Sequence, residues 1–463
     1  MMMDLLEAAL AVGGEARGKA SFDEVGSDSR AIRPGQLFVA LRGERFDGHD
    51  FLAAVAAGGA VAALVDRSFA DSQTGEAPLP LVIADDTRLA LGRLAAHWRS
   101  KFVLPLIGIT GSNGKTTVKE MCAAILRAQA AMDGFDPDLA VLSTAGNFNN
   151  DIGLPLTLLG LRAQHRAAVI EMGMNHPGEI AYLTAIAAPT VALVNNAQRA
   201  HLEGMGGLNE VAREKGAIYA GLGADGVAVI NADDPFAAYW TGLNQDRPVL
   251  RFGLEADTGA EVAGRYILKG LGATVAVQNS GRRIDFELQA PGVHNVRNAL
   301  AAAAATLAAG VSDEAVSVGL GGFAGAKGRL QRKRGVNGAV VLDDSYNANP
   351  DSVRAGIDVL AATPGRKLLV LGDMGEIGET SGQLHDEVGG YAKSQGVDQL
   401  FALGEVSAVA ARNFGEGGYH YTRLEELVSA VRKQMDADTV VLVKGSRFMR
   451  MERVIEAIVE KTN

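Results

Sequence analysis

The sequence contains almost no cysteine: Cys122 is the only one among 463 residues. One thiol cannot form a disulfide within a single chain, so the fold is stabilised without covalent crosslinks. Disulfides are rare in reducing compartments, and the composition therefore agrees with a cytoplasmic location. We interpret Cys122 as a small apolar residue of the core.

Long apolar runs are absent as well. The longest candidate, residues 51–65, is too short to span a bilayer and is interrupted at Gly58 and Gly59. Residues 1–10 lack the basic stretch and the extended apolar core of a secretory signal. We therefore expect no membrane insertion and no export, and we predict that residues 51–65 form a buried helix that runs into a strand.

An excess of positive charge is also missing. The chain has 44 Lys and Arg against 54 Asp and Glu, which gives a formal net charge of −10. General nucleic-acid binders usually present a basic surface that displaces the counterions of the phosphates. The charge balance argues against a nucleic-acid partner, and an anionic substrate would need local basic pockets.

The length and the apolar content allow several domains. Hydrophobic residues make up 48% of the chain and charged residues 21%, which is ordinary for a globular protein with ample core. Short strand patterns alternate with helical ones, and this alternation is typical of α/β folds. We predict three domains: a small α/β domain over residues 1–103, a central P-loop ATPase-like domain with a mainly parallel sheet over 104–323, and a C-terminal Rossmann-like domain over 324–463.

The expected strands are short apolar segments bounded by turn residues. In the first two domains they cover residues 37–41, 62–65, 104–109, 167–170, 191–194 and 227–230. Residues 274–277 and 284–288 indicate a small antiparallel addition, and an alanine-rich helix over 298–309 should close the central domain. The third domain has strands at 339–342, 367–371, 399–403 and 439–443. Each of these ends in polar or glycine residues, which predicts one ligand-binding rim.

The most informative segment is Gly108-Ile-Thr-Gly-Ser-Asn-Gly-Lys-Thr-Thr117, between a strand and an amphipathic helix. The amides of such a loop bind phosphates, while Lys115 reaches the outer phosphates and Thr116 holds magnesium. The segment departs from the strict Walker pattern, because Ile109 stands where a glycine is expected and Gly108 precedes it. The alternative is a chance glycine-rich loop. The predicted ATP contacts are Gly111, Ser112, Asn113, Gly114, Lys115, Thr116 and Thr117.

Two further segments contain candidate ligands. Glu171 follows the strand 167–170, where a carboxylate beside a phosphate loop suits a magnesium site. A solvated glutamate at a strand end is the simpler alternative. Asn147, Asn149 and Asn150 crowd one loop, and such side chains either bind a polar substrate or form turns. That loop by itself leaves both interpretations open.

In order and spacing, these three segments resemble the central domain of the Mur ligase family. Further blocks extend the resemblance over nearly the whole chain, at residues 27–30, 34–38, 46–49, 200–204, 215–216, 231–234, 294–298, 328–329, 371–376 and 444–447. The block Asp343-Asp-Ser-Tyr-Asn-Ala-Asn-Pro350 is the most specific, because related ligases and folylpolyglutamate synthases usually have a histidine block there. Met205 and Ala217 depart from the family pattern, which leaves the fine substrate preference open.

The resemblance implies ATP-dependent ligation of D-alanyl-D-alanine to UDP-N-acetylmuramoyl-tripeptide, a step of peptidoglycan precursor synthesis. ATP would phosphorylate the terminal carboxylate of the tripeptide, and the dipeptide amine would attack the acyl phosphate. ATP and Mg²⁺ are the implied cofactors, and the two substrates are the implied partners of a monomeric cytoplasmic enzyme that serves cell-wall growth, cell shape and division. The third residue of the tripeptide, diaminopimelate or lysine, stays open.

The resemblance also implies roles for single residues. The catalytic residues would be Lys115, Glu171, His201, Lys215 and Arg329. Magnesium would be held by Thr116, Glu171, His201 and Lys215, with Lys215 as a carbamate. ATP would further contact Asn295, Asn298, Arg329 and Asp344, the last two reaching in from the third domain as the domains close. The substrate would contact Ser29, Arg30, Asp47, Gly48, His49, Asn147, Asn149, Asn150 and Asn347.

Other interpretations stay open on these residues. Without the resemblance, His201 would count as structural and Lys215 as a helix lysine paired with Glu210 or Glu214. A sibling ligase such as folylpolyglutamate synthase would share residues 111–117 and Lys215 but is not expected to have the block 343–350. A phosphate-loop switch or transport ATPase would hydrolyse ATP without any need for D-alanyl-D-alanine.

Overall fold

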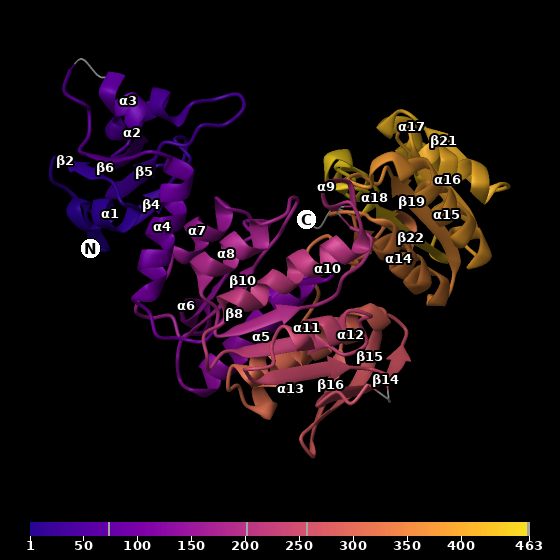
Figure 1. The fold of residues 1–463 in the computed structure, drawn as a ribbon. Coiled ribbons are helices and arrows are strands. Elements are labelled where there is room, and N and C mark those ends of the chain that lie inside the picture. The colour runs from indigo at the N-terminus through magenta and orange to yellow at the C-terminus, as the bar shows by residue number, and fades with distance from the viewer. Residues whose placement is uncertain (73–74, 201, 256–257, 461–463) are drawn as a thin grey trace.

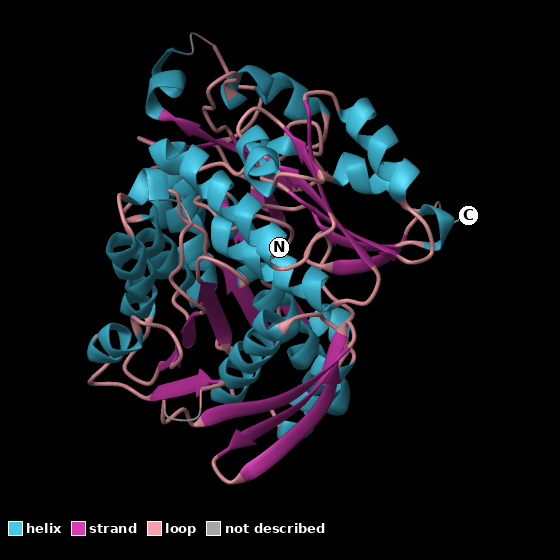
Figure 2. Cartoon of the chain, turned by 90° about the vertical axis from the view of Figure 1, so that its right-hand side faces the viewer, coloured by secondary structure: helices cyan, strands magenta, loops and turns pink. Residues whose placement is uncertain are grey.

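The computed structural model describes residues 1–72, 75–200, 202–255 and 258–460. The chain forms three lobes that follow one another from indigo through magenta to yellow in Figure 1. We call residues 1–103 the N-terminal unit, 104–323 the central unit and 324–460 the C-terminal unit. Each unit has a sheet of mostly parallel strands with helices packed against it (Figure 2). The predicted three-part α/β architecture is therefore confirmed.

The N-terminal unit is built on a sheet with the order β2-β7-β6-β5-β4, in which only β2 runs antiparallel to its neighbour. Its strands are β1 (Met3–Asp4), β2 (Glu15–Arg17), β3 (Ser21–Phe22), β4 (Glu24–Gly26), β5 (Gln36–Val39), β6 (Ala62–Asp66) and β7 (Leu81–Ala84). Its helices are α1 (Leu5–Val12), α2 (Leu52–Ala57), α3 (Arg67–Ser72), α4 (Thr87–Ser100) and the 3-10 turn η1 (Gly48–Phe51). Helix α2 followed by β6 confirms the predicted order of helix and strand within residues 51–65, but the helix is not buried as a whole, because only Leu52 and Val55 of it are buried.

Helix α4 joins the N-terminal unit to the central unit. The Asp86 side chain caps its first turn by accepting hydrogen bonds from two backbone N–H groups. Near its other end, the Trp98 indole donates to the carbonyl of Leu161 at 3.1 Å, and Arg99 Nε donates to that of Ala187 at 3.1 Å. Apolar side chains of both units form one continuous core around this helix. The two units are therefore packed together as one body.

The central sheet has the order β16-β15-β14-β13-β12-β11-β8-β10-β9, parallel from β9 to β14 and antiparallel from β14 to β16. Its strands are β8 (Leu106–Thr110), β9 (Val141–Ser143), β10 (Ala167–Glu171), β11 (Val191–Val194), β12 (Val227–Asn231), β13 (Val249–Gly253), β14 (Val262–Lys269), β15 (Gly272–Asn279) and β16 (Arg282–Leu288). Its helices are α5 (Lys115–Met132), α6 (Pro137–Ala140), α7 (Gly153–Leu158), α8 (Glu179–Ala187), α9 (Leu202–Met205), α10 (Leu208–Gly216), η2 (Ala217–Gly221), α11 (Ala237–Gly242), α12 (Val293–Ala308) and α13 (Asp313–Gly321).

The central unit confirms the predicted parallel strands and the antiparallel addition, and it corrects the alanine-rich helix. The predicted antiparallel addition is present as β15 and β16, and the unpredicted strand β14 joins it to the parallel part of the sheet (Figure 1). The alanine-rich helix α12 begins earlier than expected, at Val293, and α13 follows it. Buried alanines along α12 let it pack closely on the sheet and on α5. The helix thus supports the core under the phosphate loop and does not end the unit.

The C-terminal unit has the sheet order β17-β18-β22-β19-β20-β21, with only β17 antiparallel to its neighbour. Its strands are β17 (Gln331–Arg334), β18 (Val340–Asp344), β19 (Arg366–Gly372), β20 (Gln399–Leu403), β21 (Gly418–Tyr421) and β22 (Thr439–Lys444). Its helices are η3 (Val336–Gly338), α14 (Pro350–Ala362), η4 (Gly378–Thr380), α15 (Ser381–Ser394), α16 (Ser407–Phe414), α17 (Leu424–Gln434), η5 (Arg447–Met449) and α18 (Glu452–Ile458). The four predicted strands are confirmed; the polar edge strands β17 and β21 escaped the apolar pattern.

The C-terminal unit contacts the central unit at separate places. Leu271, at the turn between β14 and β15, packs against the apolar core of the C-terminal unit. Polar contacts near the phosphate loop make the other connection. Among the residues that the structure describes, no helix is long and apolar enough to cross a membrane.

Candidate functional site

The phosphate loop lies at the carboxyl end of β8, in the interior of the central sheet. Gly114 precedes helix α5 with a positive φ of 80°, which glycine adopts without strain. A Cβ atom at this position would lie 2.3 Å from Asn298 Oδ1 and 2.6 Å from Asn195 Nδ2. Residues from α12 and from the segment after β11 therefore leave room for glycine alone. The predicted strand–loop–helix arrangement is present, and it is supported from two other parts of the chain.

Lys115 folds back over the loop that precedes it. Its Nζ donates to the carbonyl of Gly111 at 2.6 Å and to that of Ser112 at 3.3 Å. Burial lowers the pKa of Lys115, an effect that the charge of Glu171 opposes and that of Arg329 increases. The Lys115 amine is therefore held at the loop by two carbonyls, and a bound phosphate could replace these carbonyls as its hydrogen-bond partner.

Glu171 stands at the end of β10, beside the first turn of α5. Thr116 Oγ1 donates to Glu171 Oε2 at 2.9 Å, and Asn149 Nδ2 donates to Oε1 at 2.7 Å. Glu171 is only 2% exposed, so the solvated strand-end alternative is wrong. Among the described residues no three His, Cys, Asp or Glu side chains gather into a metal-binding group. The Thr116 and Glu171 oxygens suit a magnesium ion that takes its other ligands from phosphate and water.

The segment after β11 is bound tightly to the phosphate loop. The backbone N–H of Asn113 donates to Asn196 Oδ1 at 2.8 Å, and its side chain donates to Gln198 Oε1 at 2.6 Å. Ser112 and Gln198 exchange hydrogen bonds between the Ser112 hydroxyl and the Gln198 backbone at 2.9 and 3.1 Å. Residues 195–198 therefore fix the conformation of the phosphate loop by hydrogen bonds, and we call this segment the template of the loop.

A cavity of about 590 Å³ opens between the phosphate loop and the C-terminal unit. Its lining includes the four residues predicted to contact ATP outside the loop: Asn295, Asn298, Arg329 and Asp344. Asn298 Nδ2 donates to Asn295 Oδ1 at 3.1 Å, so part of their hydrogen-bonding capacity is already used. His294 also lines this cavity, and burial lowers its pKa to about 4.

Asp344 lies at the end of β18 and forms a buried ion pair. Lys444, at the end of β22, donates to its Oδ2 at 2.6 Å and to the carbonyl of Asn347 at 2.9 Å. Burial raises the pKa of Asp344 and lowers that of Lys444, in both cases against the effect of the partner's charge. The pair holds the rim of the C-terminal sheet together.

A second cavity, of about 900 Å³, begins at the phosphate loop and extends to the N-terminal unit. All three units contribute to it. Residues from the N-terminal unit are Asp86, Arg88 and Leu89; from the central unit they include Lys115, Thr116, Asn147, Asn149, Asn150 and Glu171; from the C-terminal unit they include Arg329, Tyr346, Asn347 and Arg447. A ligand that reaches from the phosphate loop to α4 fits this shape.

The asparagines of the loop 147–150 have different roles. Asn149 supports Glu171, whereas Asn150 Oδ1 accepts from the backbone N–H of Gly153 at 2.8 Å and so shapes the turn before α7. Asn147 lines the larger cavity with both of them. The two interpretations of this loop therefore apply to different residues.

The residues predicted for the N-terminal unit lie apart from this cavity. Arg30 is highly exposed, next to Ser29. Its two side-chain hydrogen bonds to Asp28, both 2.9 Å, and a third from its backbone N–H lower the pKa of that carboxyl to about 2. Among the described residues that line the larger cavity, those of the N-terminal unit are Asp86, Arg88 and Leu89, and neither Arg30 nor His49 is among them.

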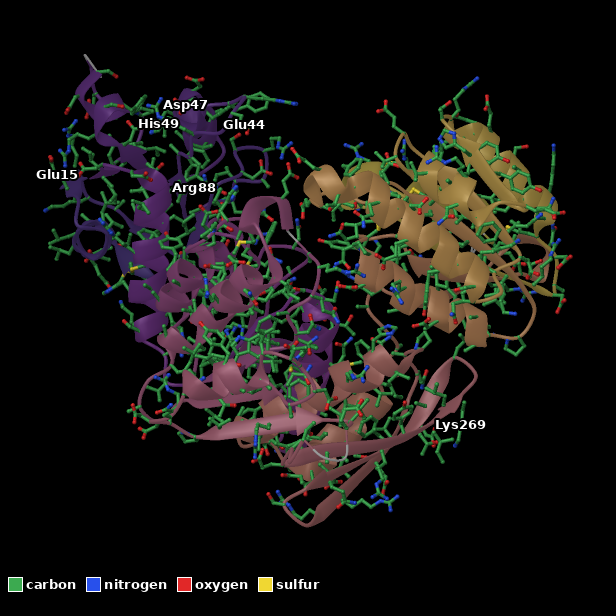
Figure 3. All side chains as sticks on the ribbon, turned by 45° about the vertical axis from the view of Figure 1, so that its right-hand side comes forward. Glu15, Glu44, Asp47, His49, Arg88 and Lys269 are labelled. Atoms are coloured by element: carbon green, nitrogen blue, oxygen red, sulfur yellow. The ribbon has the colours of Figure 1, made fainter. Side chains whose placement is uncertain are left out.

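His49 is an internal residue. Its Nδ1 lies 2.5 Å from Asp47 Oδ1, and its Nε2 accepts from the backbone N–H of Asp66 at 3.1 Å. Figure 3 shows Asp47 and His49 side by side in the N-terminal unit. Gly48 lies so close to Leu41 that a Cβ would meet its backbone nitrogen at 2.7 Å. Both ring nitrogens are occupied, so His49 orients its loop and offers no free nitrogen to a ligand.

Lys215 is a buried lysine on α10, with 1% of its surface exposed. Burial lowers its pKa well below the ordinary value, and the charge of Lys115 lowers it further. The alternative ion pairs are not formed: Glu214 accepts from the N–H groups at the start of α8, and Glu210 contacts Arg213. The charge of Glu214 opposes this lowering of the Lys215 pKa. His201, predicted beside it, lies outside the described residues.

Several lining residues were not predicted from the sequence. Tyr346 and Arg447 lie inside the recognised blocks 343–350 and 444–447, yet the pattern assigned them no role. The Tyr346 ring lies 4.2 Å from the Arg329 guanidinium and 5.6 Å from that of Arg447. The position of the aromatic residue Tyr346 just after a predicted strand was the feature of the sequence that could have indicated its place in the site. Met205 and Ala217, the two departures, pack against the apolar core.

Comparison with known proteins identifies the same three parts. The Mur ligase family, catalytic domain, matches residues 21–99; the Mur ligase middle domain matches 109–306; and the Mur ligase, glutamate ligase domain, matches 328–447. Among solved structures, MurF from Acinetobacter baumannii is similar with a TM-score of 0.88 and 34% identity over 98% of this chain and 97% of that one. MurF ligase from Thermotoga maritima in complex with ADP is similar with a TM-score of 0.80 and 26% identity over 94% and 96%.

Curated relatives match over nearly the full length. The UDP-N-acetylmuramoyl-tripeptide–D-alanyl-D-alanine ligase of Escherichia coli is 41% identical over 96% of both chains. The enzyme of the same name from Bacillus subtilis is 34% identical over 94% of this chain and 93% of its own. The chain therefore belongs to the Mur ligase family, in its branch of UDP-N-acetylmuramoyl-tripeptide–D-alanyl-D-alanine ligases.

Proposed function

We propose that this chain ligates D-alanyl-D-alanine to UDP-N-acetylmuramoyl-tripeptide at the expense of ATP. One observation supports this above all: the phosphate loop opens into a cavity of about 900 Å³ whose lining comes from all three units. A nucleotide, a long anionic acceptor and a dipeptide can then meet at one point. The relatives at 41% and 34% identity bear the name of this activity.

Peptide-bond formation from a free carboxylate is unfavourable in water, so the carboxylate has to be activated. The γ-phosphoryl group of ATP moves to the terminal carboxylate oxygen of the tripeptide, and ADP leaves. The dipeptide amine then attacks the acyl carbon, loses a proton, and phosphate departs. Within the chain, Lys115 and the loop amides hold the phosphates, and Arg329 offsets the charge that develops.

Thr116 and Glu171 are the residues that would hold magnesium in this scheme. A magnesium ion held there would supply positive charge that offsets the charge of the phosphates. The 2.9 Å contact between Thr116 and Glu171 and the burial of Glu171 support this assignment. We also propose His201 as a magnesium ligand, and this proposal rests on the family pattern alone.

Lys215 enters the proposal as a carbamate. A neutral amine adds to carbon dioxide, with loss of one proton, and turns a cationic side chain into an anion with two oxygens. The lowered pKa of Lys215 favours the neutral amine that this reaction needs. Oxygen ligands suit a hard cation, whereas an ammonium group would repel it.

Substrate contacts complete the proposal. Asn147, Asn149 and Asn347 line the larger cavity, and Ser29 and Arg30 offer an exposed basic turn for the UDP part. We assign the enzyme to the cytoplasm as a monomer, in cell-wall synthesis that serves cell shape and division.

The test is ADP release with UDP-linked tripeptides that contain diaminopimelate or lysine, each with and without D-alanyl-D-alanine. We expect release only when both peptide substrates are present, and a product whose mass increases by the dipeptide less one water. Equal ADP release without the dipeptide would instead identify an ATPase.

A further inference from the structure

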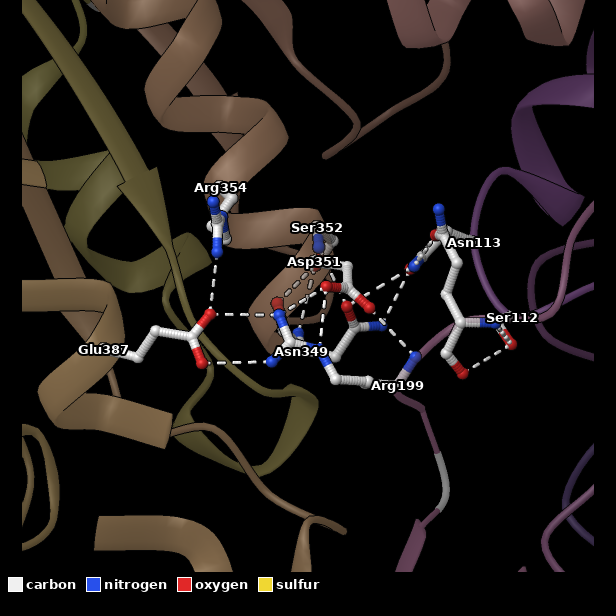
Figure 4. Close-up of polar contacts among 9 residues, drawn as sticks. Ser112, Asn113, Arg199, Asn349, Asp351, Ser352, Arg354 and Glu387 are labelled. Carbon is white, nitrogen blue, oxygen red and sulfur yellow. Dashed lines mark hydrogen bonds and ion pairs between the residues drawn. The ribbon is translucent and has the colours of Figure 1, made fainter. Parts of the chain in front are cut away.

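Arg199 connects the central unit to two helices of the C-terminal unit (Figure 4). Its Nε and Nη2 donate to Asp351 Oδ1 at 3.0 and 2.6 Å, and its Nη1 and Nη2 donate to the Glu387 carboxylate at 3.0 and 3.1 Å. The backbone N–H of Arg199 adds a bond to Asp351 Oδ2 at 2.9 Å. One planar guanidinium therefore binds two carboxylates at once, which a lysine cannot reproduce.

The Glu387 carboxylate is also held from within the C-terminal unit. Arg354 Nη1 donates to Glu387 Oε1 at 2.9 Å, and its guanidinium lies 4.2 Å from the Tyr391 ring. Asp351 lies in the first turn of α14. The three side chains of the Arg199 contact are each about one-third exposed or less. Shared, partly shielded charges of this kind contribute more than an isolated surface pair.

The segment that carries Arg199 is the same one that shapes the phosphate loop through Asn196 and Gln198. A second contact crosses the interface at the loop itself, where Asn349 Nδ2 donates to Asn113 Oδ1 at 2.7 Å. Asn349 caps α14, two residues before Asp351. The start of α14 therefore touches the loop and its template together (Figure 4).

Arg329 is linked to the same helix. The residues 345–349 connect β18 to α14, and the backbone N–H of Tyr346 donates to the carbonyl of Gly328 at 3.3 Å. The Arg329 guanidinium lies over the Tyr346 ring. A shift of α14 relative to the central unit would therefore move Arg329 away from the phosphate loop.

We propose that Arg199 is a positioning residue, which through Asp351 and Glu387 sets the orientation of the C-terminal unit that brings Arg329 to the phosphate loop. The inference rests on the proposed function, because the alignment matters for a nucleotide held between the two units. Arg199 and Asp351 line the nucleotide cavity, but among the described residues that line the cavities at the phosphate loop Glu387 does not appear. Substitution of Glu387 therefore separates the interdomain contact from direct contact with ATP.

The experiment uses the full-length variants Arg199→Ala, Arg199→Lys and Glu387→Gln, and the double variant Arg199→Ala/Glu387→Gln. The matched control is Arg251→Ala, because Arg251 pairs with Glu261 at 2.7 Å within the central unit at similar exposure. ATP affinity is measured by calorimetry, and the radius of gyration by small-angle scattering, both without peptide substrates.

We expect Arg199→Ala and Glu387→Gln to weaken ATP binding about tenfold, as a shift in domain populations does, and to enlarge the radius of gyration. The double variant should be no worse than Arg199→Ala, Arg199→Lys should recover only part of the affinity, and Arg251→Ala should match the unsubstituted protein. Unchanged scattering and affinity in both single variants would overturn the proposal. An effect of Arg199→Ala that Glu387→Gln does not share would also overturn it.

These measurements do not depend on the ligase reaction. If the unsubstituted protein releases ADP without the dipeptide, the proposed function fails while the domain measurements still decide the role of Arg199. If ligation proceeds as proposed and the variants behave like Arg251→Ala, only the role of Arg199 fails.

Discussion

The central unit meets its two neighbours through interfaces of opposite character. Towards the N-terminal unit it shares a continuous apolar core, and α4 is anchored by Trp98 and Arg99 to backbone carbonyls of the central unit. Near the phosphate loop, it meets the C-terminal unit through side chains such as Asn113 and Arg199, with cavities between them. The first interface is built around a shared apolar core, whereas the second is polar where it meets the phosphate loop.

The difference indicates which unit is free to move. Separating apolar surfaces exposes them to water at a cost proportional to their area, so the first interface holds its geometry. Hydrogen bonds and partly exposed ion pairs exchange with water at little net cost, so the second can open and close. We infer that the N-terminal and central units move as one body and that the C-terminal unit closes on it.

The substitution with the largest expected effect lies at the polar interface. Lys115→Ala should lower kcat about 1000-fold, since the loop cation is needed where phosphate charge develops. The melting temperature should stay nearly unchanged, because the substitution removes hydrogen bonds to two loop carbonyls and no part of the apolar core. Steady-state ADP release and thermal unfolding check the two halves of this prediction. Near-normal turnover would contradict the nucleotide assignment.

The apolar interface should respond in the opposite way. Trp98→Ala removes a side chain that is 8% exposed and should cost about 3 kcal/mol of stability. Trp98→Phe, the control, keeps most of the apolar contact and should lose less. Denaturant unfolding measures both. The comparison of the interfaces fails if Trp98→Ala changes kcat strongly while leaving the unfolding midpoint in place.

Substitution of Lys215 tests whether this buried lysine acts as an anionic carbamate. Lys215→Ala should lower activity about 100-fold, the upper range for a group that supports a metal site. Added short carboxylates should restore part of the activity, because they can occupy the vacated anion position. Activity assays with and without formate, in buffers with and without carbon dioxide, give the answer. A variant that works normally in carbon-dioxide-depleted buffer would exclude the carbamate as a catalytic element.

Arg30 gives the smallest expected effect. Arg30→Ala should weaken binding of the UDP-linked substrate about tenfold, the value of one charge-assisted hydrogen bond. ATP affinity should not change, because Arg30 lies in the N-terminal unit outside the cavities at the phosphate loop. Calorimetry with each ligand measures the two effects. Equal losses for both ligands would show that the units do not divide the substrates between them.

The sequence was sufficient where a short segment decides its own structure. The strand, loop and helix around residues 106–132 follow from local spacing, and Glu171 at the end of the next strand lies within hydrogen-bonding distance of Thr116. The sequence was insufficient where a side chain forms hydrogen bonds within the protein and not with a ligand. His49 was expected at the substrate, but its two ring nitrogens bind Asp47 and the Asp66 backbone. The sequence around His49 is compatible with a histidine that binds substrate and with one that is bonded internally, so it could not distinguish the two.

By itself, the sequence determined the order of the elements, the phosphate loop and the family, because these depend on periodicity and on motifs of a few neighbouring residues. Only the tertiary structure decided which distant groups meet. Arg199 and Asp351 are 152 residues apart, and Asn113 and Asn349 are 236 residues apart. Such pairs form only after separate sheets have folded and docked, so no local pattern contains them.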